Sequence, residues 1–171
     1  VPYPNQNIFE EGIFNQNIIM SNKIIEGENF SNVDYNGKGL EGQKYDSCTF
    51  SKCDFSDAHL SGITFMECEF DECDFSNARV KDTAWKDVRF VNCKLLGLSF
   101  NDCNDFLLAM NFEDCNLRYA SFHELKLRGT KFKNCNLQEV DFASADLTSA
   151  VFEQCDLKRT IFDRTILVKA D

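Results

Sequence analysis

The chain has 171 residues, of which 43% are hydrophobic, and its 28 acidic against 18 basic residues give a formal net charge of −10. This size and composition predict one folded domain and exclude a disordered acidic tail. The charge argues against direct binding to nucleic acid, which needs clustered Lys and Arg, and favours a basic partner. No apolar run suits a membrane span and no signal peptide is recognisable, so we expect a soluble chain without membrane contact.

Large apolar residues recur at every fifth position along most of the chain. The series runs from Phe50 to Phe100 without a polar exception, and after two inserted residues it continues from Phe112 to Leu167. Neither the helical period of 3.6 nor the alternation of an ordinary strand accounts for this spacing. A unit with two inward and three outward residues suits one side of a four-sided coil, so four units would close a turn of about 20 residues.

The residues in every fourth unit support this coil, because they fall into uniform columns. One column of centres is entirely Phe, and one column two positions before the centres holds a cysteine in each coil. A random placement would seldom produce either column. The predicted core ladder consists of Phe50, Phe70, Phe90, Phe112, Phe132 and Phe152 together with Cys53, Cys73, Cys93, Cys115, Cys135 and Cys155.

All nine cysteines occupy the position two residues before a centre, if position 105 is counted as the centre that the interruption replaces. Strands stacked about 4.8 Å apart bring the Cα atoms within disulfide range, but parallel Cβ vectors point the wrong way for a disulfide. We therefore expect free, buried thiols in a reducing compartment, the cytoplasm, rather than a redox or metal ladder. The pairs Cys48–Cys53 and Cys68–Cys73 have a spacing seen in zinc sites, but both members should face inward from adjacent sides. No metal site and no cofactor is expected.

The chain resembles the pentapeptide-repeat family, whose unit is written A(D/N)LXX, with Phe often replacing Leu and Cys often replacing Ala. The closest segments are CDFSDAHLSG, CDFSNARV and ADLTSAVFEQCDLKRT, and the resemblance covers at least residues 46–171. It implies an all-β fold, a right-handed quadrilateral parallel β-helix in which each coil pairs with its neighbours. With the weaker N-terminal coils included, we expect one domain over residues 1–171 with about eight coils.

Both ends of the repeat are less regular. In residues 1–45 the period is weaker, and at the other end Ala170 and Asp171 begin a unit that has no centre. We expect a cap beyond Asp171, because an open strand edge invites aggregation. The family resemblance implies that such a C-terminal region could form a homodimer. The N-terminal centres are assigned to Phe9, Phe14, Ile19 and Ile24 and, after one extra residue, to Phe30, Tyr35, Leu40 and Tyr45.

The interruption at residues 103–110 places seven residues where five belong, so the fourth side of that coil must bulge. In one interpretation Phe106 or Leu107 still fills the core column while two residues loop outward. In the other, residues 104–108 form a recognition site that exposes Asp105, Phe106 and Leu107, since partner sites concentrate in loops on rigid scaffolds.

Catalytic motifs are missing from the sequence. No phosphate-binding glycine motif, HExxH or GxSxG occurs. The two histidines, His59 and His123, fall at outward positions on different coils, and neither has a nucleophile arranged beside it. We predict that the protein is not an enzyme.

Negative charge is concentrated in the N-terminal half. Residues 1–79 hold 14 acids and 5 bases (net −9), whereas residues 80–171 hold 14 acids and 13 bases (net −1). Any single carboxylate is most simply a solvating charge. Carboxylates stacked at strand spacing repel each other, however, so stability alone would not favour a column of them. The densest run is Glu67, Glu69, Asp71, Glu72 and Asp74, and a separate column is formed by Asp82, Asp102 and Glu124.

These lines of charge suggest a mimic of DNA. Carboxylates about 4.8 Å apart approach the roughly 3.4 Å axial spacing of phosphates on one DNA strand, so the rod could occupy a basic DNA-binding groove. The chain also looks like the Qnr-type branch of the family, whose members bind DNA gyrase or topoisomerase IV and relieve quinolone inhibition. It differs from that branch in lacking long projecting loops and in carrying a basic stretch at Lys126, Arg128, Lys131 and Lys133.

A second hypothesis is a protein–protein interaction scaffold that uses one flat face and the bulge at residues 104–108. Steep weakening of partner binding by salt would support the DNA mimic, because exposed charges dominate such binding. Salt-insensitive binding that depends on Phe106 or Leu107 would support the scaffold.

Overall fold

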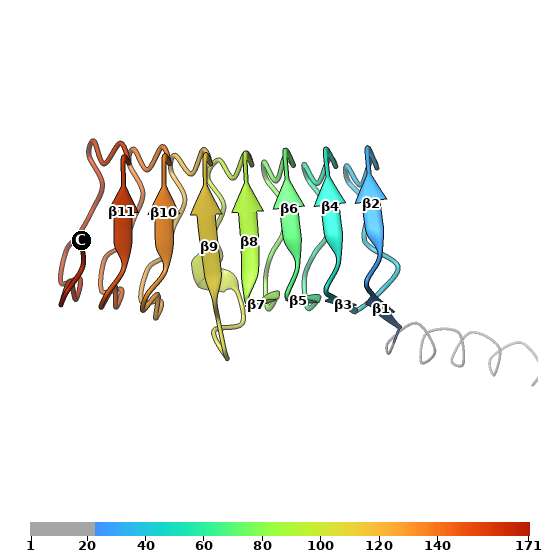
Figure 1. Ribbon diagram of the computed structural model, residues 1–171, viewed down its shortest axis with the longest axis horizontal. Coiled ribbons are helices and arrows are strands. Elements are labelled where there is room, and N and C mark those ends of the chain that lie inside the picture. Colours follow the sequence, from blue (N-terminus) through green and yellow to red (C-terminus); the bar gives the residue numbers. More distant parts are fainter. Residues whose placement is uncertain (1–22) are drawn as a thin grey trace, which may run out of the picture.

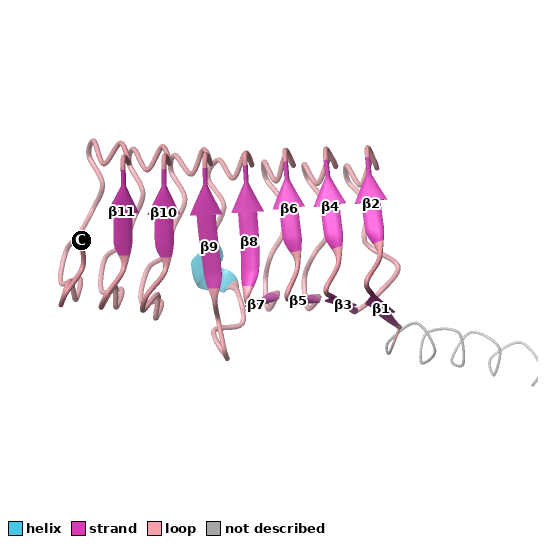
Figure 2. Ribbon diagram, in the orientation of Figure 1, coloured by secondary structure: helices cyan, strands magenta, loops and turns pink. Residues whose placement is uncertain are grey.

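The computed structural model describes residues 23–171, which form one elongated, four-sided parallel β-solenoid (Figure 1). The predicted centres at Phe9, Phe14 and Ile19 lie outside the described residues. All strands are short, and the single helical segment among residues 23–171 is one turn of 3-10 helix, η1 (Figure 2). The elements are β1 (Ile24–Glu26), β2 (Asn29–Ser31), β3 (Lys44–Asp46), β4 (Thr49–Ser51), β5 (Thr64–Met66), β6 (Glu69–Asp71), β7 (Ala84–Lys86), β8 (Val88–Val91), η1 (Phe100–Asp102), β9 (Met110–Glu113), β10 (Lys131–Lys133) and β11 (Val151–Glu153).

Four parallel ladders form the four sides of the coil. One side is a seven-stranded sheet in the order β11-β10-β9-β8-β6-β4-β2, and another is a four-stranded sheet in the order β1-β3-β5-β7. The other two sides are held by isolated parallel bridges, such as Asp54↔Asp74 and Ser121↔Asp141. Phe50 pairs with Phe70, 20 residues further along, which confirms the predicted five-residue unit with four units to a turn.

The seven-stranded sheet spans six turns, from Phe30 in β2 to Phe152 in β11. This is fewer than the predicted eight coils, which included residues 1–22. The assignment of Ile24 as a centre is wrong, because Ile25 pairs with Tyr45 while the Ile24 side chain is 61% exposed. Neighbouring residues of a strand point to opposite faces, so only one of two adjacent isoleucines can face inward.

The column of Phe side chains fills the centre of the rod along the seven-stranded sheet. The rings of Phe50 and Phe70 stack with centroids 4.8 Å apart, and those of Phe112 and Phe132 with centroids 5.2 Å apart. Ring planes in these pairs are 10° and 4° from parallel. This separation follows from the strand spacing and matches offset stacking of aromatic rings. The column is buried from Phe50 to Phe132, and Phe152 is half-buried at the C-terminal end.

The corners of the coil explain why Asp and Asn recur around the centres. Corner residues adopt the left-handed conformation, as in Asp57 (φ 54°) and Asp82 (φ 59°), which costs least for Gly, Asn and Asp. The residue before a centre makes a turn of its own: the Oδ1 atom of Asp74 accepts the backbone N–H of Ser76 at 2.8 Å. Many carboxylates therefore have a local structural role that is independent of any partner.

The cysteines are all free, as predicted, and Cys155 alone among them is only half-buried. Five of the six ladder thiols, all but that of Cys135, donate to backbone carbonyls of the preceding coil, for example from Cys73 Sγ to Phe50 O at 3.3 Å. These bonds satisfy the thiols inside an apolar core.

Candidate protein-binding surface

The four-stranded side of the rod is interrupted after β7. One further bridge, Ala84↔Asn104, continues the ladder, which resumes only with Lys126↔Asp146. Asn104 N donates to Thr83 O at 2.9 Å, and Ala109 N donates to Trp85 O at 2.9 Å. Residues 105–108 thus occupy the place of one centre residue. We call residues 104–108 the insertion loop.

The insertion loop has a defined conformation. Asn104 Oδ1 accepts the backbone N–H of Phe106 at 2.9 Å, and Leu108 N donates to Asp105 O at 3.3 Å. Leu107 has a φ of 59°, a left-handed conformation that costs a residue with a β-carbon about 1–2 kcal/mol. The same left-handed conformation recurs at the corners of the regular coils, for example at Tyr119 and Glu124.

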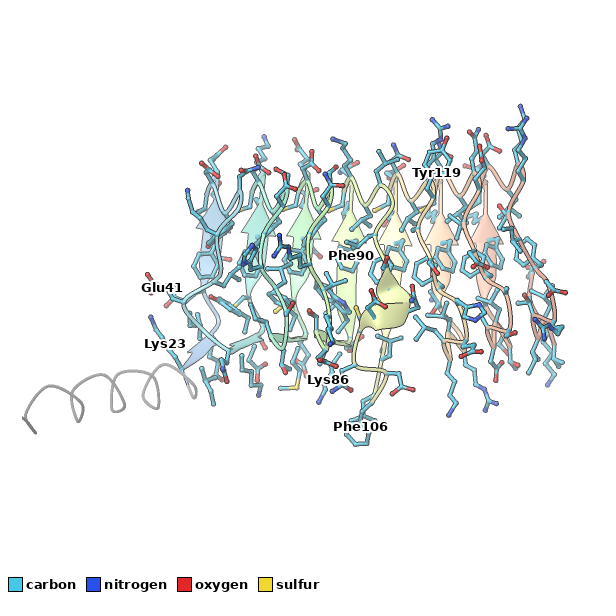
Figure 3. All side chains as sticks on the ribbon, turned by 180° about the vertical axis from the view of Figure 1, so that it is seen from behind. Lys23, Glu41, Lys86, Phe90, Phe106 and Tyr119 are labelled. Carbon is cyan, nitrogen blue, oxygen red and sulfur yellow. The ribbon has the colours of Figure 1, made fainter. Side chains whose placement is uncertain are left out.

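The tip of the insertion loop is apolar and exposed. The side chains of Phe106 and Leu107 are 67% and 66% exposed, and Phe106 projects away from the rod (Figure 3). The interpretation in which one of them fills the core column is therefore wrong. Leu108 packs against the core instead, because the detour of residues 105–108 turns the two preceding side chains outward.

Lys86, on β7, lies close to the tip of the insertion loop. Its Nζ atom lies 5.5 Å from the centroid of the Phe106 ring, a cation–π distance (Figure 3). We did not single out Lys86 from the sequence. The five-residue period could have found it, because Lys86 is an outward residue exactly one coil before the insertion.

Asp82, Asp102 and Glu124, here called the acidic corner, lie beside the insertion loop. Asp82 N donates to Asp102 O at 2.8 Å, and Glu124 lines one hollow together with Asp105 of the loop. Within residues 23–171, neither Asp82, Asp102 nor Asp105 forms an ion pair, and Glu124 has only His123, at 3.3 Å. The structure therefore joins two features that the sequence presented separately, a column of carboxylates and an apolar bulge.

Cys103, which follows Asp102 in the chain, is buried in the core beside the acidic corner. Burial raises the pKa of the Cys103 thiol to about 12, and the nearby carboxylates of Asp102 and Asp82 act in the same direction. The thiol accepts a hydrogen bond from Trp85 Nε1, with a nitrogen–sulfur distance of 3.1 Å. Cys103 is thus a protonated core residue and offers no reactive thiolate to this surface.

The acidic run at residues 67–74 has a different environment. Glu69 pairs with Arg89 at 3.0 Å, Glu72 with Lys52 at 3.7 Å and Asp74 with Lys94 at 2.8 Å. Asp71 accepts a hydrogen bond from Asn92 Nδ2 at 3.1 Å. Glu67 alone has no such partner within the described part of the chain. The run is also divided between β6 and two corners, so it forms no continuous acidic line.

Opposite charges alternate along the seven-stranded sheet. Arg89 contacts Glu113 at 2.7 Å in addition to Glu69, and Glu113 contacts Lys133 at 3.0 Å. Hydrogen bonds from Arg89 and Lys133 hold the pKa of Glu113 below its ordinary value. The basic stretch is compensated in part: Arg128 pairs with Asp146 at 2.6 Å and Lys133 with Glu113, whereas Lys126 and Lys131 form no ion pair within the described residues. This side therefore presents nearly balanced charge.

The described residues contain no arrangement suited to catalysis on a metal. No group of three or more His, Cys, Asp or Glu side chains within residues 23–171 could hold a metal ion. His59 and His123 lie on different coils of the rod. Among the same residues, no helix has the length and apolarity that crossing a membrane would require.

The family model for the pentapeptide repeat region matches residues 38–105, 63–142 and 99–171. The chain belongs to the pentapeptide-repeat family. This pentapeptide-repeat protein is similar to a trypsin-treated form of QnrB1, a plasmid-mediated fluoroquinolone resistance protein, with a TM-score of 0.51 and 18% identity over 85% of this chain and 79% of that one. At that identity the likeness establishes the fold alone.

Two further solved structures are less similar by TM-score. Full-length QnrB1 gives a TM-score of 0.48 with 21% identity, over 87% of this chain and 86% of that one. HetL from Nostoc sp. strain PCC 7120, a pentapeptide-repeat protein involved in heterocyst differentiation regulation, gives 0.35 with 17% identity, over 98% and 95%. No curated protein matches the sequence.

Proposed function

We propose that this protein is a non-enzymatic binding module that mimics DNA, engages the basic DNA-binding groove of DNA gyrase or topoisomerase IV and modulates quinolone action. The observation that carries the proposal is the acidic corner. Asp82 and Glu124 occupy left-handed corners, Asp102 ends η1 in the coil between them, and no Lys or Arg forms an ion pair with any of the three within the described residues. The resemblance to the Qnr-type branch supplies the candidate partner.

Ion pairing with neighbouring bases decides which carboxylates can attract a distant partner electrostatically. A carboxylate held in an ion pair contributes little to the field outside the protein, whereas unpaired carboxylates in line attract a basic groove and accelerate association. The coil spacing of about 4.8 Å is of the same order as the roughly 3.4 Å axial spacing of phosphates on one DNA strand. Because the solenoid is already ordered, little conformational entropy is lost when it binds.

The test is a gyrase supercoiling titration with the purified protein, with and without a quinolone, at two salt concentrations. We expect protection from the quinolone or direct inhibition, weakened by salt and by the triple variant Asp82→Asn, Asp102→Asn and Glu124→Gln. Asn is used at Asp82 because it tolerates the left-handed corner conformation. Absence of any effect at a large molar excess would refute this function for the gyrase tested.

A second candidate function rests on the insertion loop. The exposed apolar pair Phe106 and Leu107 is suited to a protein–protein interaction scaffold, in which an apolar anchor enters a pocket of the partner. Binding that is insensitive to salt and lost in Phe106→Ala would favour this scaffold over the DNA mimic.

A further inference from the structure

The column of six cysteines places thiols of successive coils in register. Cys135 and Cys155 are flanked by the pairs Lys133↔Glu153 and Asn136↔Asp156, so they lie on neighbouring segments at the strand spacing of about 4.8 Å. Cys135 Sγ donates to Lys133 O at 3.2 Å, and Cys155 Sγ donates to Glu153 O at 3.5 Å. Each thiol donates to the carbonyl two residues before it, so the two side chains point in a similar direction, and Cys155 Sγ also donates to Phe132 O of the preceding coil at 3.3 Å.

This arrangement does not suit a disulfide but suits a two-coordinate metal. A disulfide needs sulfurs about 2.05 Å apart, whereas thiols of equal orientation stay near the strand spacing. Two metal–thiolate bonds of about 2.3 Å, placed in line, span about 4.6 Å. Zinc requires four ligands, and the described residues contain no cluster of three or more metal-binding side chains.

We propose that Cys135 and Cys155 bind a soft monovalent cation, Cu(I), as a linear thiolate bridge between two successive coils. Thiolates are the ligands that select Cu(I) over harder cations. In this reaction two S–H bonds break, two Cu–S bonds form and two protons pass to solvent, with no change of oxidation state. Copper therefore has to be supplied as Cu(I).

The C-terminal pair differs from the other pairs of the column in access. The other five thiols, from Cys53 to Cys135, are each 2% exposed, whereas Cys155 is half-buried. An ion reaching Cys155 from solvent meets Cys135 as the next sulfur inward.

Cys135 loses fewer hydrogen bonds on binding Cu(I) than the other thiols of the column. Cys135 Sγ donates to Lys133 O alone, whereas Cys93 and Cys155 each donate to two backbone carbonyls. Binding must displace the proton of each thiol, so the affinity for Cu(I) rises with pH.

The experiment is an anaerobic titration of the reduced full chain with Cu(I), in competition with bicinchoninate, followed by X-ray absorption at the copper edge. We expect a first equivalent held by two sulfur ligands, with an affinity that rises with pH. Cys155→Ala and Cys135→Ala should each abolish this first equivalent. Cys103→Ala is the matched control, because Cys103 is a buried thiol outside the column. This variant should retain the first equivalent of Cu(I).

Circular dichroism and gel filtration establish that each variant keeps its fold. Retention of the first equivalent in folded Cys155→Ala would overturn the proposal, as would a copper site with three sulfurs or with nitrogen ligands. If the protein has no effect in the supercoiling assay, the copper-binding test still stands, because the copper site is separate from the acidic corner.

Discussion

The carboxylates of residues 67–74 and those of the acidic corner belong to the same rod, but their neighbours one coil away are different. Glu69 and Asp74 each face a basic residue 20 positions further along, Arg89 and Lys94. In the acidic corner, the residue one coil after Asp82 is Asp102, and the residue one coil after Asp102 is Glu124. The surface charge of a solenoid therefore depends on the residue in the next coil more than on the density of acids along the chain.

The same comparison distinguishes acidic residues that the local backbone conformation accounts for from those that it does not. Asp82 occupies a left-handed corner that Asp tolerates well, and Asp74 holds a turn with Ser76. Glu124 is also left-handed, with a φ of 62°, and Glu has no such tolerance. Glu124 is thus the member of the acidic corner that local structure explains least.

The largest expected difference in the free energy of unfolding is between a substitution in the regular coils and one in the insertion loop. Phe90 is fully buried, and its ring stacks on those of Phe70 and Phe112 at centroid distances of 5.3 Å. Phe90→Ala should lower the free energy of unfolding by about 3–5 kcal/mol, measured by urea denaturation. Phe106→Ala, which removes an exposed ring, should change it by less than about 0.5 kcal/mol. Equal losses in the two variants would contradict the assignment of Phe106 to the surface.

A second prediction concerns Asp146, whose carboxylate accepts hydrogen bonds from Thr148 and Arg128. Hydrogen bonds from Thr148, and then the ion pair with Arg128, lower the pKa of Asp146 to about 2 from an ordinary 3.8. A folded-state pKa below the unfolded value stabilises the fold above about pH 4, and this contribution is lost as the pH falls towards about 2.

Thermal unfolding of wild type and Asp146→Asn across this range measures the effect. The variant keeps an acceptor for the turn but has no charge to titrate. We expect it to be less stable than wild type at pH 6, with the two curves converging near pH 2. A constant difference between pH 6 and pH 2 would show that the ion pair does not contribute in this way.

A small effect on stability, of opposite sign to that of Phe90→Ala, is expected at Leu107. Leu107→Gly removes left-handed strain, but it also makes the unfolded chain more flexible, so the net gain in the free energy of unfolding should be at most about 1 kcal/mol. Urea denaturation measures the gain, and Leu107→Ala, which keeps a β-carbon, is the control. A variant Leu107→Gly less stable than Leu107→Ala would mean that the loop is not strained.

The sequence was sufficient for the parts of the fold that repeat. The Phe and Cys columns, the interruption and the outward position of the carboxylates all follow from a five-residue period. Two adjacent isoleucines, Ile24 and Ile25, could not be separated by hydropathy alone, and this produced the error in register. The period also does not say which residue of an insertion stays inward, so the burial of Leu108 in place of Phe106 or Leu107 required the structure.

Ion pairs were the other feature that sequence reasoning missed. The pairing of Glu69 with Arg89 can be read from the 20-residue turn, but Arg89 also reaches Glu113, which lies 24 residues away across the insertion. Such diagonal contacts depend on side-chain conformation. The proximity of the acidic corner to the insertion loop could have been noticed, because Asp102 and Asp105 flank Cys103 in the chain.

Direct binding to DNA-free gyrase tests the central claim most closely, with two triple variants that remove the same number of charges. One is the acidic-corner variant Asp82→Asn, Asp102→Asn and Glu124→Gln, and the other is Glu69→Gln, Asp71→Asn and Glu72→Gln in the compensated run. We predict that the corner variant binds at least about tenfold more weakly, that the run variant changes affinity by less than about threefold, and that duplex DNA competes with the wild-type protein. Equal weakening by the two variants, or binding that duplex DNA does not displace, would contradict the account.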